Sequence, residues 1–540
     1  MTVDGFGASS APSVTPAIVW SVAGNDSGGG AGLAADQRAA AGLGVHLCPV
    51  VAALTAQNSR IVTRVDPVAP ELLDAQLAAL AEDLPPVAIK TGLLGSVDNV
   101  AVVARWVDRL RATWPLALVV DPVLGASSGA AFADAAVLDA YRELLLPRAT
   151  LVTPNEGEAR RLVGTGAEAL RAPQLGQALR AFGAAAVAIT GGDSAHAPGL
   201  ALDWIDTAHA RGWLLLPRID SPHTHGTGCT LASSATSALA LGFVAGDALV
   251  LAKMATAHAI AHGHAAGQGA GPVGPRADFA TQPERLPLLS WDESLDCERW
   301  SRLLHGPCAG EGPADIGLYA IVDRIERVSL VLAGGVKTVQ LRIKTPPRPD
   351  AAWHAGLRVA VQQALAACRQ ADATLVVNDH WRLAAELAAG DVRHLAVHLG
   401  QEDLLALDAA GRAELAASGL RLGVSSHSLW ELCRARGLAP WYVACGPVWP
   451  TLTKAMPWQP QGLDNLAWWV HMAGLPVLAI GGILEHAQAE RAARSGAAGV
   501  CVVRGLGDDP AASAPAWQAA IERGRTLSRL PVPSLPHPSL

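Results

Sequence analysis

Residues 317–343 read GLYAIVDRIERVSLVLAGGVKTVQLRI. The runs at 317–322 and 338–343 are short and apolar, so both are predicted to be buried β-strands. The stretch between them has the composition of a helix. A strand, a helix and a second strand in succession predict two parallel strands joined by a helical crossover.

The same unit recurs through the C-terminal part of the chain. Six further strands are expected, at residues 374–379, 394–400, 421–427, 441–448, 476–483 and 499–505. Eight β/α units within roughly 215 residues are typical of a (β/α)₈ TIM barrel. We assign the barrel to residues 315–530 and expect the Pro/Ser-rich residues 531–540 to be a flexible tail.

The N-terminal part, residues 15–282, also alternates strands with Ala-rich helices. Five buried strands are expected, at residues 17–24, 86–94, 116–123, 150–155 and 186–192. This pattern predicts an α/β sandwich with a mostly parallel sheet. Residues 283–314 have prolines, mixed charge and no strand pattern, so we expect a linker with one short helix.

The composition indicates a globular chain with at least two domains. The chain has 540 residues, of which 50% are hydrophobic and 16% are charged. Such a chain is too long for one ordinary core and too apolar to be disordered. The formal net charge is −7 without a Lys/Arg block, so neither nucleic acid nor an acidic membrane is an expected partner.

Three features favour a cytoplasmic location. The eight cysteines are scattered and form no Cys-x-x-Cys pair, which suits a reducing cytosol. Residues 1–16 lack the basic start and apolar run of a signal peptide. The most apolar long window, roughly residues 235–252, contains Asp247 and is predicted to be a buried helix rather than a membrane span.

Residues 223–230 read HTHGTGCT and precede an Ala-rich helix. Consecutive N–H groups of Gly226, Thr227, Gly228 and Cys229 would point into one concavity, which is an anion hole for a transferring phosphoryl group. The helix dipole favours a Cys229 thiolate, which could take a proton from a substrate hydroxyl. The alternative for a lone cysteine is a buried structural role.

Two other loops follow strands in this half. In GNDSGGGAGLAAD (24–36) the glycines let the backbone approach a ligand, or merely form a tight turn. In TPNEGEA (153–159), Asn155 and Glu158 can face one Mg²⁺ through water, or form a capping box. Asp121 ends a strand, where an acid can help to position metal or phosphate.

Over about residues 17–280 the chain resembles the hydroxymethylpyrimidine/phosphomethylpyrimidine kinase family, which has a ribokinase-like fold. The matching segments are GNDSGGGAG, LTAQN, VVDPV, TPNEGEA and THGTGCT. The resemblance implies two ATP-dependent phosphorylations, first of a hydroxyl and then of the monophosphate. It implies these site residues: Asp36, Gln57 and Leu93 for the pyrimidine; Asp121, Asn155, Glu158 and Thr190 for Mg-ATP; and Gly226, Gly228 and Cys229 for the anion hole, with Cys229 as the base.

One departure from this family concerns the ATP phosphates. The family usually has Lys-Gly-Gly-His where this chain has Thr190-Gly191-Gly192-Asp193. Threonine supplies no charge, so the N-terminal half could instead be a pyrimidine-binding module without phosphate transfer. A pyridoxine-type kinase is another alternative, because that group shares the fold and the Gly-Thr-Gly-Cys turn; Gln57 favours the pyrimidine.

Polar residues gather at the predicted C-terminal ends of the barrel strands, where TIM-barrel active sites lie. Arg342, Lys344 and Lys454 supply cations that can hold a pyrophosphate. Asp379 and Asp403 follow neighbouring strands and can share a Mg²⁺. The glycines at 481–482 follow the seventh strand, where barrels commonly bind phosphate.

Over about residues 315–508 the chain resembles thiamine phosphate synthase, in the segments QLRIK, VND, HLGQED, GVSSH, GPVWPTLTK and IGGI. That family joins hydroxymethylpyrimidine diphosphate to a thiazole phosphate and releases pyrophosphate. The resemblance implies these residues: Gln340, Arg342, Lys344, Asn378, Ser425 and Lys454 for the pyrimidine diphosphate; Thr451, Thr453, Gly481, Gly482, Val503 and Arg504 for the thiazole phosphate; and Asp379 and Asp403 for Mg²⁺. Arg504 stands where the family often has serine.

The two resemblances fit one another. The first half would make the diphosphate that the second half consumes, so we expect a bifunctional enzyme of thiamine biosynthesis. Its partners would be small-molecule substrates and its cofactor Mg²⁺, with ATP as co-substrate. By analogy with both folds, a homo-oligomer is possible.

Overall fold

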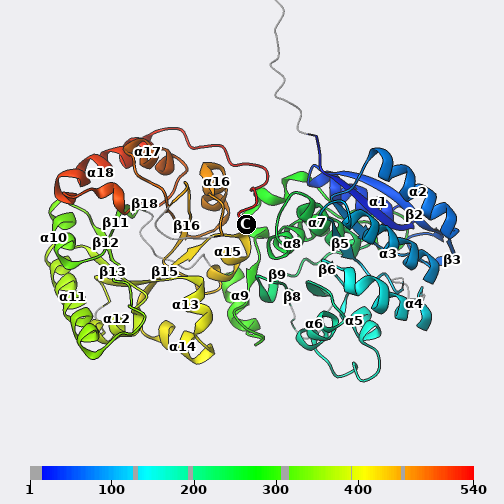
Figure 1. Cartoon of the computed structure of the whole chain (residues 1–540), viewed down its shortest axis with the longest axis horizontal. Helices are drawn as coiled ribbons and strands as arrows, with labels where there is room; N and C mark the ends of the chain where they lie inside the picture. The colour runs from blue at the N-terminus through cyan, green and yellow to red at the C-terminus, as the bar shows by residue number, and fades with distance from the viewer. Residues whose placement is uncertain are drawn as a thin grey trace, which may run out of the picture.

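The computed structural model describes residues 15–125, 132–192, 197, 199–305, 315–390, 392–451 and 457–540. Two α/β units lie side by side, with the barrel on the left and the N-terminal unit on the right of Figure 1. The expected α/β class and order of the two units are confirmed.

The N-terminal unit is built on a ten-stranded sheet. In spatial order its strands are β10 (Leu288–Leu289), β9 (Arg211–Pro217), β8 (Leu200–Asp206), β7 (Val187–Gly191), β6 (Leu151–Val152), β5 (Ala117–Val120), β4 (Ala88–Thr91), β1 (Ile18–Asn25), β2 (His46–Gln57) and β3 (Val62–Pro67). The strands from β7 to β2 in this order are parallel, and those at both margins are antiparallel. The mostly parallel sheet expected from the sequence is therefore confirmed.

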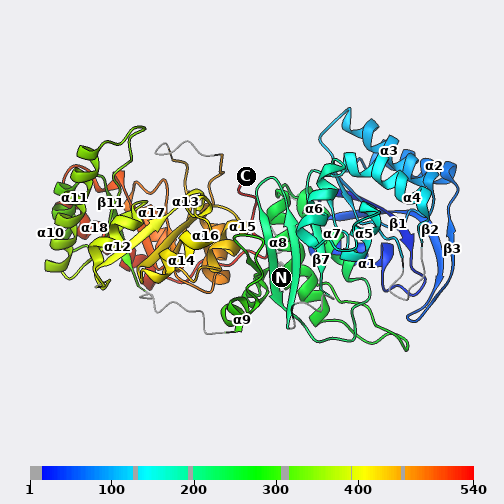
Figure 2. The same cartoon turned by 90° about the horizontal axis from the view of Figure 1, so that it is seen from below.

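Helices cover both faces of this sheet, as Figure 2 shows. They are α1 (Gly32–Gly42), α2 (Pro70–Asp83), α3 (Val97–Arg111), α4 (Ala135–Ala140), α5 (Glu156–Val163), α6 (Ala172–Ala181), α7 (Thr227–Ala240) and α8 (Ala245–Ala261). Helices α1, α7 and α8 pack with Val19 on one face, whereas α2, α3, α5 and α6 pack with Trp20 on the other. Successive residues of β1 thus enter two different cores, because side chains alternate along a strand.

Residues 283–305 form more structure than the expected linker with a single helix. Leu288 and Leu289 form β10, which pairs with β9, and α9 (Cys297–His305) is the one short helix. Both leucines are buried, with 3% and 1% of their surface exposed. A strand of two residues beside prolines is too short to show a periodic pattern in the sequence. It nevertheless hydrogen-bonds to β9, which would otherwise be the edge strand of the sheet.

The C-terminal unit is a closed barrel of eight parallel strands, which confirms the TIM barrel. The strands are β11 (Gly317–Val322), β12 (Thr338–Leu341), β13 (Thr374–Asn378), β14 (Leu395–Leu399), β15 (Arg421–Ser426), β16 (Tyr442–Cys445), β17 (Val477–Ala479) and β18 (Gly499–Val502). Closure comes from β11, which pairs with both β12 and β18. All eight lie within the stretches expected from the sequence.

Helices surround the barrel, so that its strands are buried on both faces. They are α10 (Ile325–Ala333), α11 (Ala351–Gln370), α12 (Trp381–Ala388), α13 (Gln401–Ala406), α14 (Ala409–Ala417), α15 (Leu429–Arg436), α16 (Gly462–Met472), α17 (His486–Arg494) and α18 (Pro510–Thr526). Inside the barrel, Tyr319, Val376 and Leu478 belong to a separate core.

The C-terminal residues differ from the expected flexible tail, because they make defined contacts at the junction of the two units. The His537 N–H donates to Asn465 Oδ1 at 2.8 Å, and the Gln459 N–H donates to Ser539 O at 2.9 Å. Figure 1 shows the C-terminus between the barrel and the N-terminal unit. Backbone hydrogen bonds, which composition does not reveal, thus hold this Pro/Ser segment in place.

The apolar window at 235–252 is divided between the end of α7 and the start of α8. Asp247, inside that window, is buried with 2% of its surface exposed. None of the helices in the described ranges is long and apolar enough to cross a membrane.

Candidate active sites

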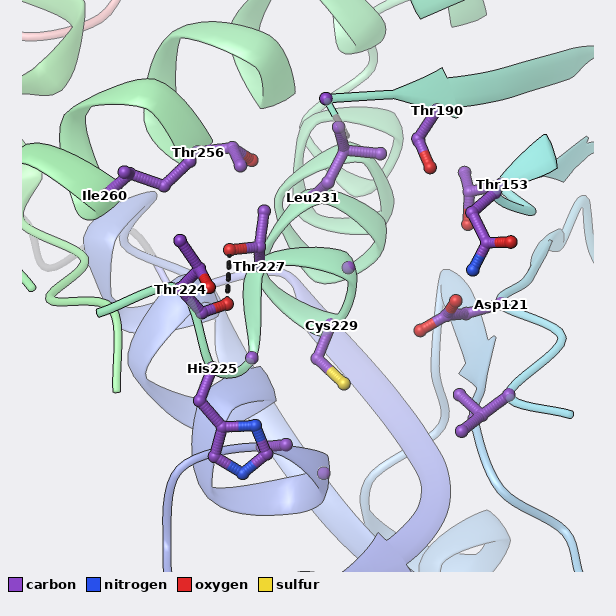
Figure 3. Close-up of a pocket in the computed structure, with 18 of the residues that line it drawn as sticks. Asp121, Thr153, Thr190, Thr224, His225, Thr227, Cys229, Leu231, Thr256 and Ile260 are labelled. Atoms are coloured by element: carbon purple, nitrogen blue, oxygen red, sulfur yellow. Dashed lines mark hydrogen bonds between the residues drawn. The ribbon is translucent and has the colours of Figure 1, made fainter. Parts of the chain in front are cut away.

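The first candidate site is a cavity of about 560 Å³ between the C-terminal ends of the parallel strands and the start of α7 (Figure 3). Nine residues named from the sequence line it: Gln57, Leu93, Asp121, Asn155, Glu158, Thr190, Gly226, Gly228 and Cys229. Strand ends and a helix N-terminus meet here because all crossovers of a parallel sheet bring their loops to one edge.

The first turn of α7 presents free backbone donors to this cavity. Gly226 caps the helix in the left-handed conformation, with φ of 84°, and an added Cβ would lie 2.2 Å from Gly30 O. The Thr227 N–H is used locally, since it donates to Thr224 O at 3.3 Å. The N–H groups of Gly226, Gly228 and Cys229 have no acceptor within the described part of the chain. They are therefore available to an anion.

Cys229 points into the cavity between His225 and Asp121 (Figure 3). Burial raises the pKa of its thiol to about 12, although the nearby Lys90 ammonium opposes that rise. Without bound substrate the group is thus a thiol at neutral pH. Burial thus favours the thiol rather than the expected thiolate, and Asp36 and Asp121 add negative charge nearby. The role of Cys229 as a base stays a prediction.

A buried ion cluster lies beneath the cavity. Lys90 Nζ, on β4, is 3.0 Å from Asp36 Oδ2 and 3.4 Å from Asp121 Oδ2. Asp36 also accepts hydrogen bonds from the hydroxyls of Ser21 at 2.6 Å and Ser233 at 2.7 Å. Asp36 is fully buried and does not line the cavity. Its expected hydrogen bond to the pyrimidine is therefore corrected: the carboxylate is occupied in holding Lys90.

The glycine-rich loop after β1 binds a carboxylate of its own. Asp26 accepts hydrogen bonds from the N–H groups of Gly28 at 2.8 Å, Gly30 at 3.0 Å and Ala31 at 2.9 Å. His225 Nε2 lies 3.0 Å from the same carboxylate. Burial raises the pKa of Asp26, but the hydrogen bonds from His225 and the backbone outweigh it and leave that pKa below its usual range. Sequence reasoning missed this pair, although both residues stand inside motifs it quoted.

Asn155 and Glu158 form the capping box that was the alternative to a metal site. Asn155 Oδ1 accepts from the Glu158 N–H at 2.9 Å, and Glu158 Oε2 accepts from the Asn155 N–H at 3.0 Å. Burial, and then the charge of Asp121, raises the pKa of Glu158 to about 7. Asp121 Oδ2 has no hydrogen-bond partner among the described residues, and burial raises the pKa of Asp121.

These two acids suit a cation, since both are costly to keep ionised without one. The described residues contain no group of three His, Cys, Asp or Glu side chains able to hold a metal alone. A Mg²⁺ beside Asp121 and Glu158 would therefore need oxygens from a nucleotide or from water, as in sites that bind Mg-ATP.

A second lysine lies close to Thr190. Thr190 is the residue before the last of β7 and pairs with Asp203 of β8, and Lys253 Nζ from α8 is 2.6 Å from Asp203 Oδ2. Lys253 and Asp203 are both buried and both line the cavity. The missing family lysine at 190 is thus accompanied by a buried cation from another element. Nothing in the Ala-rich sequence around Lys253 indicated this contact.

The second candidate site is the rim of the barrel. Asn378, Asp379, Ser425, Gly481 and Gly482 stand at or just after strand ends, and because all strands are parallel they share one end. Gln340 lies on β12; Arg342 and Lys344 follow β12, Asp403 lies in α13, Thr451 follows β16, and Val503 and Arg504 follow β18. Thr453 and Lys454 lie outside the described residues.

A chain of hydrogen bonds runs from this rim into the barrel. Ser425 Oγ is 2.8 Å from His398 Nε2, and His398 Nδ1 is 2.9 Å from the Tyr442 hydroxyl. Tyr442 contacts the Tyr319 hydroxyl at 2.7 Å, to which Gln340 Nε2 donates at 2.9 Å. Burial, helped by the charge of Arg342, lowers the pKa of His398 to about 4, so the imidazole is neutral.

The two acids expected to hold metal stand on neighbouring strand–helix units. Asp379 follows β13 in the left-handed conformation, with φ of 67°, and its N–H donates to His398 O at 3.0 Å. Asp403 Oδ2 accepts from the Gly400 N–H at 2.9 Å. Both side chains are exposed and β13 pairs with β14. Two exposed carboxylates fit a Mg²⁺ whose other ligands are substrate oxygens.

Gly481 and Gly482 are required by a close approach of two loops. Both have positive φ, 93° and 72°, and a Cβ at Gly482 would lie 2.6 Å from Trp449 O. The Trp449 N–H donates to Gly481 O at 3.1 Å, which ties the loop after β16 to the loop after β17. The loop after β16, which bears Thr451, and the loop after β17, which bears Gly481 and Gly482, are thus in contact.

Comparison with known proteins covers both units. Residues 26–274 match the phosphomethylpyrimidine kinase family, and residues 318–506 match the thiamine monophosphate synthase family. A probable thiamine biosynthetic bifunctional enzyme of Oryza sativa subsp. japonica is 32% identical over 86% of this chain and 81% of its own length. The chain belongs to the family of thiamine biosynthetic bifunctional enzymes.

Relatives that consist of only one of the two units also match the corresponding half of this chain. A hydroxymethylpyrimidine/phosphomethylpyrimidine kinase of Synechococcus elongatus is 40% identical over 48% of this chain and 96% of its own length. A thiamine-phosphate synthase of Rhizobium etli is 42% identical over 39% and 97%. The structure of a pyridoxal kinase from Staphylococcus aureus in complex with ADP has a TM-score of 0.44 and 27% identity, over 48% of this chain and 93% of that one. The expected bifunctional assignment is confirmed by these matches, and the closed barrel agrees with it.

Proposed function

We propose that this chain phosphorylates 4-amino-5-hydroxymethyl-2-methylpyrimidine twice with ATP and then condenses the diphosphate with 4-methyl-5-(2-phosphoethyl)thiazole. The products are thiamine phosphate and pyrophosphate. The observation that carries the proposal is the match of one bifunctional relative across 86% of the chain. An anion-binding helix start in one half and a barrel rim with cations and paired acids in the other support it.

In the kinase half, the pyrimidine would lie between Gln57 and Leu93, with its hydroxyl near Cys229. The hydroxyl oxygen attacks the γ-phosphorus of ATP, its proton passes to Cys229 Sγ, and ADP leaves. Because the free pocket favours a thiol, Cys229 must first pass its proton to solvent as substrate binds, and the Lys90 ammonium favours that loss. The free N–H groups of α7 stabilise charge on the transferring phosphoryl group.

Asp121, Asn155 and Glu158 would face the ATP phosphates together with Mg²⁺. The ion would supply positive charge to the phosphates. Lys253 would add a cation on the side where Thr190 has none. The raised pKa values of Glu158 and Asp121, both caused chiefly by burial, support this assignment, since a cation relieves both.

In the synthase half, Arg342, Lys344, Asn378, Ser425 and Lys454 would bind the diphosphate, with Asp379 and Asp403 at its Mg²⁺. The bond from the pyrimidine methylene carbon to the diphosphate oxygen breaks, and pyrophosphate takes the electron pair. The thiazole nitrogen then attacks the methylene cation beside Gln340. The thiazole phosphate would be held by the remaining rim residues, which are Thr451, Thr453, Gly481, Gly482, Val503 and Arg504.

The first experiment is to incubate the pure protein with the pyrimidine alcohol, Mg-ATP and thiazole phosphate and to measure thiamine phosphate. Product in this mixture is the expected result. Product only when the pyrimidine diphosphate is supplied would refute the kinase half of the proposal. Pyridoxine offered in place of the pyrimidine alcohol distinguishes the pyridoxine-type kinase, which would prefer it.

A pyrimidine-binding module without phosphate transfer is the second candidate, and Thr190 favours it. If the N-terminal half is such a module, the native chain binds the pyrimidine without forming ADP, and only the Thr190→Lys variant forms ADP. On ours, the native chain already forms ADP with the pyrimidine alcohol, and Thr190→Lys alters the rate without creating the activity. A coupled ADP assay on both proteins separates the two.

We also propose that the protein works in the cytoplasm on small molecules, without nucleic acid or membrane, and that it forms a homo-oligomer. Seven cysteines of the described residues are free, which suits a reducing compartment. Size-exclusion chromatography with light scattering tests the oligomer, and cell fractionation tests the location.

A further inference from the structure

Helix α8 extends from the kinase cavity to the barrel. Its C-terminal half lines the cavity with Lys253, Thr256 and Ile260. Its first turn packs against α15 of the barrel, where a Cβ added at Gly246 would lie 2.9 Å from Trp430 Cδ1. One helix of the kinase unit therefore contacts both functional halves (Figure 1).

Asp247 in this first turn acts as a cap for a helix of the other unit. Its Oδ1 accepts from the Trp430 N–H at 2.9 Å, at the second residue of α15. Ser428 Oγ accepts the next N–H, that of Glu431, at 3.3 Å. The first N–H groups of a helix have no partner within the helix, so a buried α15 start needs both acceptors. Asp247 is 2% exposed, so water does not replace it.

The start of α15 lies directly behind the synthase rim. The preceding strand, β15, carries Ser425, and His427 connects that strand to the helix. Glu431 Oε2 accepts from the His427 N–H at 2.5 Å and lies 3.0 Å from His427 Nδ1. A shift of the first turn of α15 would therefore move the segment that holds Ser425.

The same turn also reaches the other side of the diphosphate site. Trp458, which follows the loop after β16, stacks on the His427 ring with centroids 5.2 Å apart and lies 6.4 Å from Trp430. Gln461 Nε2 donates to His427 O at 2.6 Å. The Trp430 ring, whose backbone N–H donates to Asp247, thus lies beside Trp458, which in turn stacks on His427 next to the strand that bears Ser425.

We propose that Asp247 of the kinase unit is a positioning residue of the thiamine phosphate synthase site. By capping α15 across the junction, it fixes Ser425 and the Trp458 side of the diphosphate site. This inference rests on the proposed synthase function. It gives the kinase half a role in the second reaction that does not depend on phosphate transfer.

The test compares Asp247→Ala with Asp247→Asn in the full chain, with pyrimidine diphosphate supplied. Alanine removes the acceptor, whereas asparagine keeps a carbonyl oxygen in its place. We expect the KM for the diphosphate to rise about five-fold in Asp247→Ala with little change in kcat, as loss of one cap implies. Asp247→Asn should restore the native KM. Asp98→Ala, at an exposed acid in the first turn of α3, is the matched control.

Gly246→Ala is a second variant, since its Cβ would displace Trp430 while leaving Asp247 in place; it should raise the same KM. Calorimetric titration with inorganic pyrophosphate and Mg²⁺ measures binding without turnover and should weaken in parallel. A native KM and native pyrophosphate affinity in Asp247→Ala would overturn the proposal, as would equal losses of kinase and synthase activity. A native chain that makes no thiamine phosphate from supplied substrates would instead refute the synthase function.

Discussion

At the scale of the residue, the proposed kinase mechanism uses Cys229 as a base, which must lose its proton before it can act. We expect Cys229→Ala to lower pyrimidine phosphorylation about 10²-fold or more, in the range for removal of a general base. Condensation from supplied diphosphate should be unchanged, because Cys229 lies in the other unit. Cys48→Ala, at a buried cysteine of β2 outside the cavity, is the control. Equal loss in both variants would point to a fault in folding rather than in catalysis.

His398 makes the barrel sensitive to acid. Its folded pKa of about 4 lies below the usual value of 6.5, so the unfolded chain binds the proton more readily. Stability is therefore fully present above pH 6.5 and is lost as the pH falls toward 4; at pH 5 the loss is about 2 kcal/mol. Calorimetry at pH 7 and pH 5 should show a smaller fall in the Tm of the barrel for His398→Gln. An equal fall in both proteins would assign the acid sensitivity to other groups.

Several site residues could be named from the sequence because they stand in short motifs next to strand ends. Lys90 could not, since its partners Asp36 and Asp121 come from two other elements and meet it only in the folded unit. The same holds for Lys253 and Asp203. Burial is the main cause of the raised pKa of Cys229, and the sequence of a helix start does not indicate how far its thiol is buried.

At the scale of the element, the start of α7 is shaped by a clash that only glycine avoids. Gly226→Ala would place a Cβ 2.2 Å from Gly30 O in a left-handed backbone. We expect phosphorylation to fall about 10²-fold, in the range for loss of one oxyanion donor, because the N–H groups of the turn must shift. Gly166→Ala has a similar φ of 88° and no heavy atom within 4 Å of the new Cβ. That control carries the backbone strain alone, so activity near native is expected for it.

Prediction of elements succeeded where the pattern was repeated. The eight barrel strands follow one periodic unit, and each was found within the expected stretch. In the first sheet, the five expected strands are β1, β4, β5, β6 and β7, all of them parallel and buried. The other five strands of this sheet were not named: they are the parallel β2 and the antiparallel β3, β8, β9 and β10. Strand β10 has only two residues and β3 is largely exposed, so neither has a continuous apolar run. Strand β9, in contrast, contains the buried apolar run 213–216, which the sequence does show.

At the scale of the whole molecule, the last residues of the chain hold the junction together. Asn465 Nδ2 donates to His537 O at 3.0 Å, and Pro538 lies near Gly242 of the kinase unit. We expect deletion of residues 535–540 to lower the free energy of unfolding by about 1–3 kcal/mol, since Asn465 loses its hydrogen bonds to His537 and keeps the one to Gln461. Asn465→Ala should have a similar effect, and combining both changes should add little. A fully additive double variant would show that the tail acts elsewhere.

Strand β10 limits the positions at which the chain can be divided into its two enzymes. It completes the sheet of one catalyst, while the Leu286 carbonyl just before it accepts from Arg436 of the other at 2.7 Å. If the two halves were separated at residue 282, β9 would lose its pairing with β10. It would then be an exposed edge strand, which favours aggregation. Separation is tolerable only when residues 283–305 stay with the first half. Residues 283–305 thus contact both enzymes, and separating the two halves of the chain would disturb one of them.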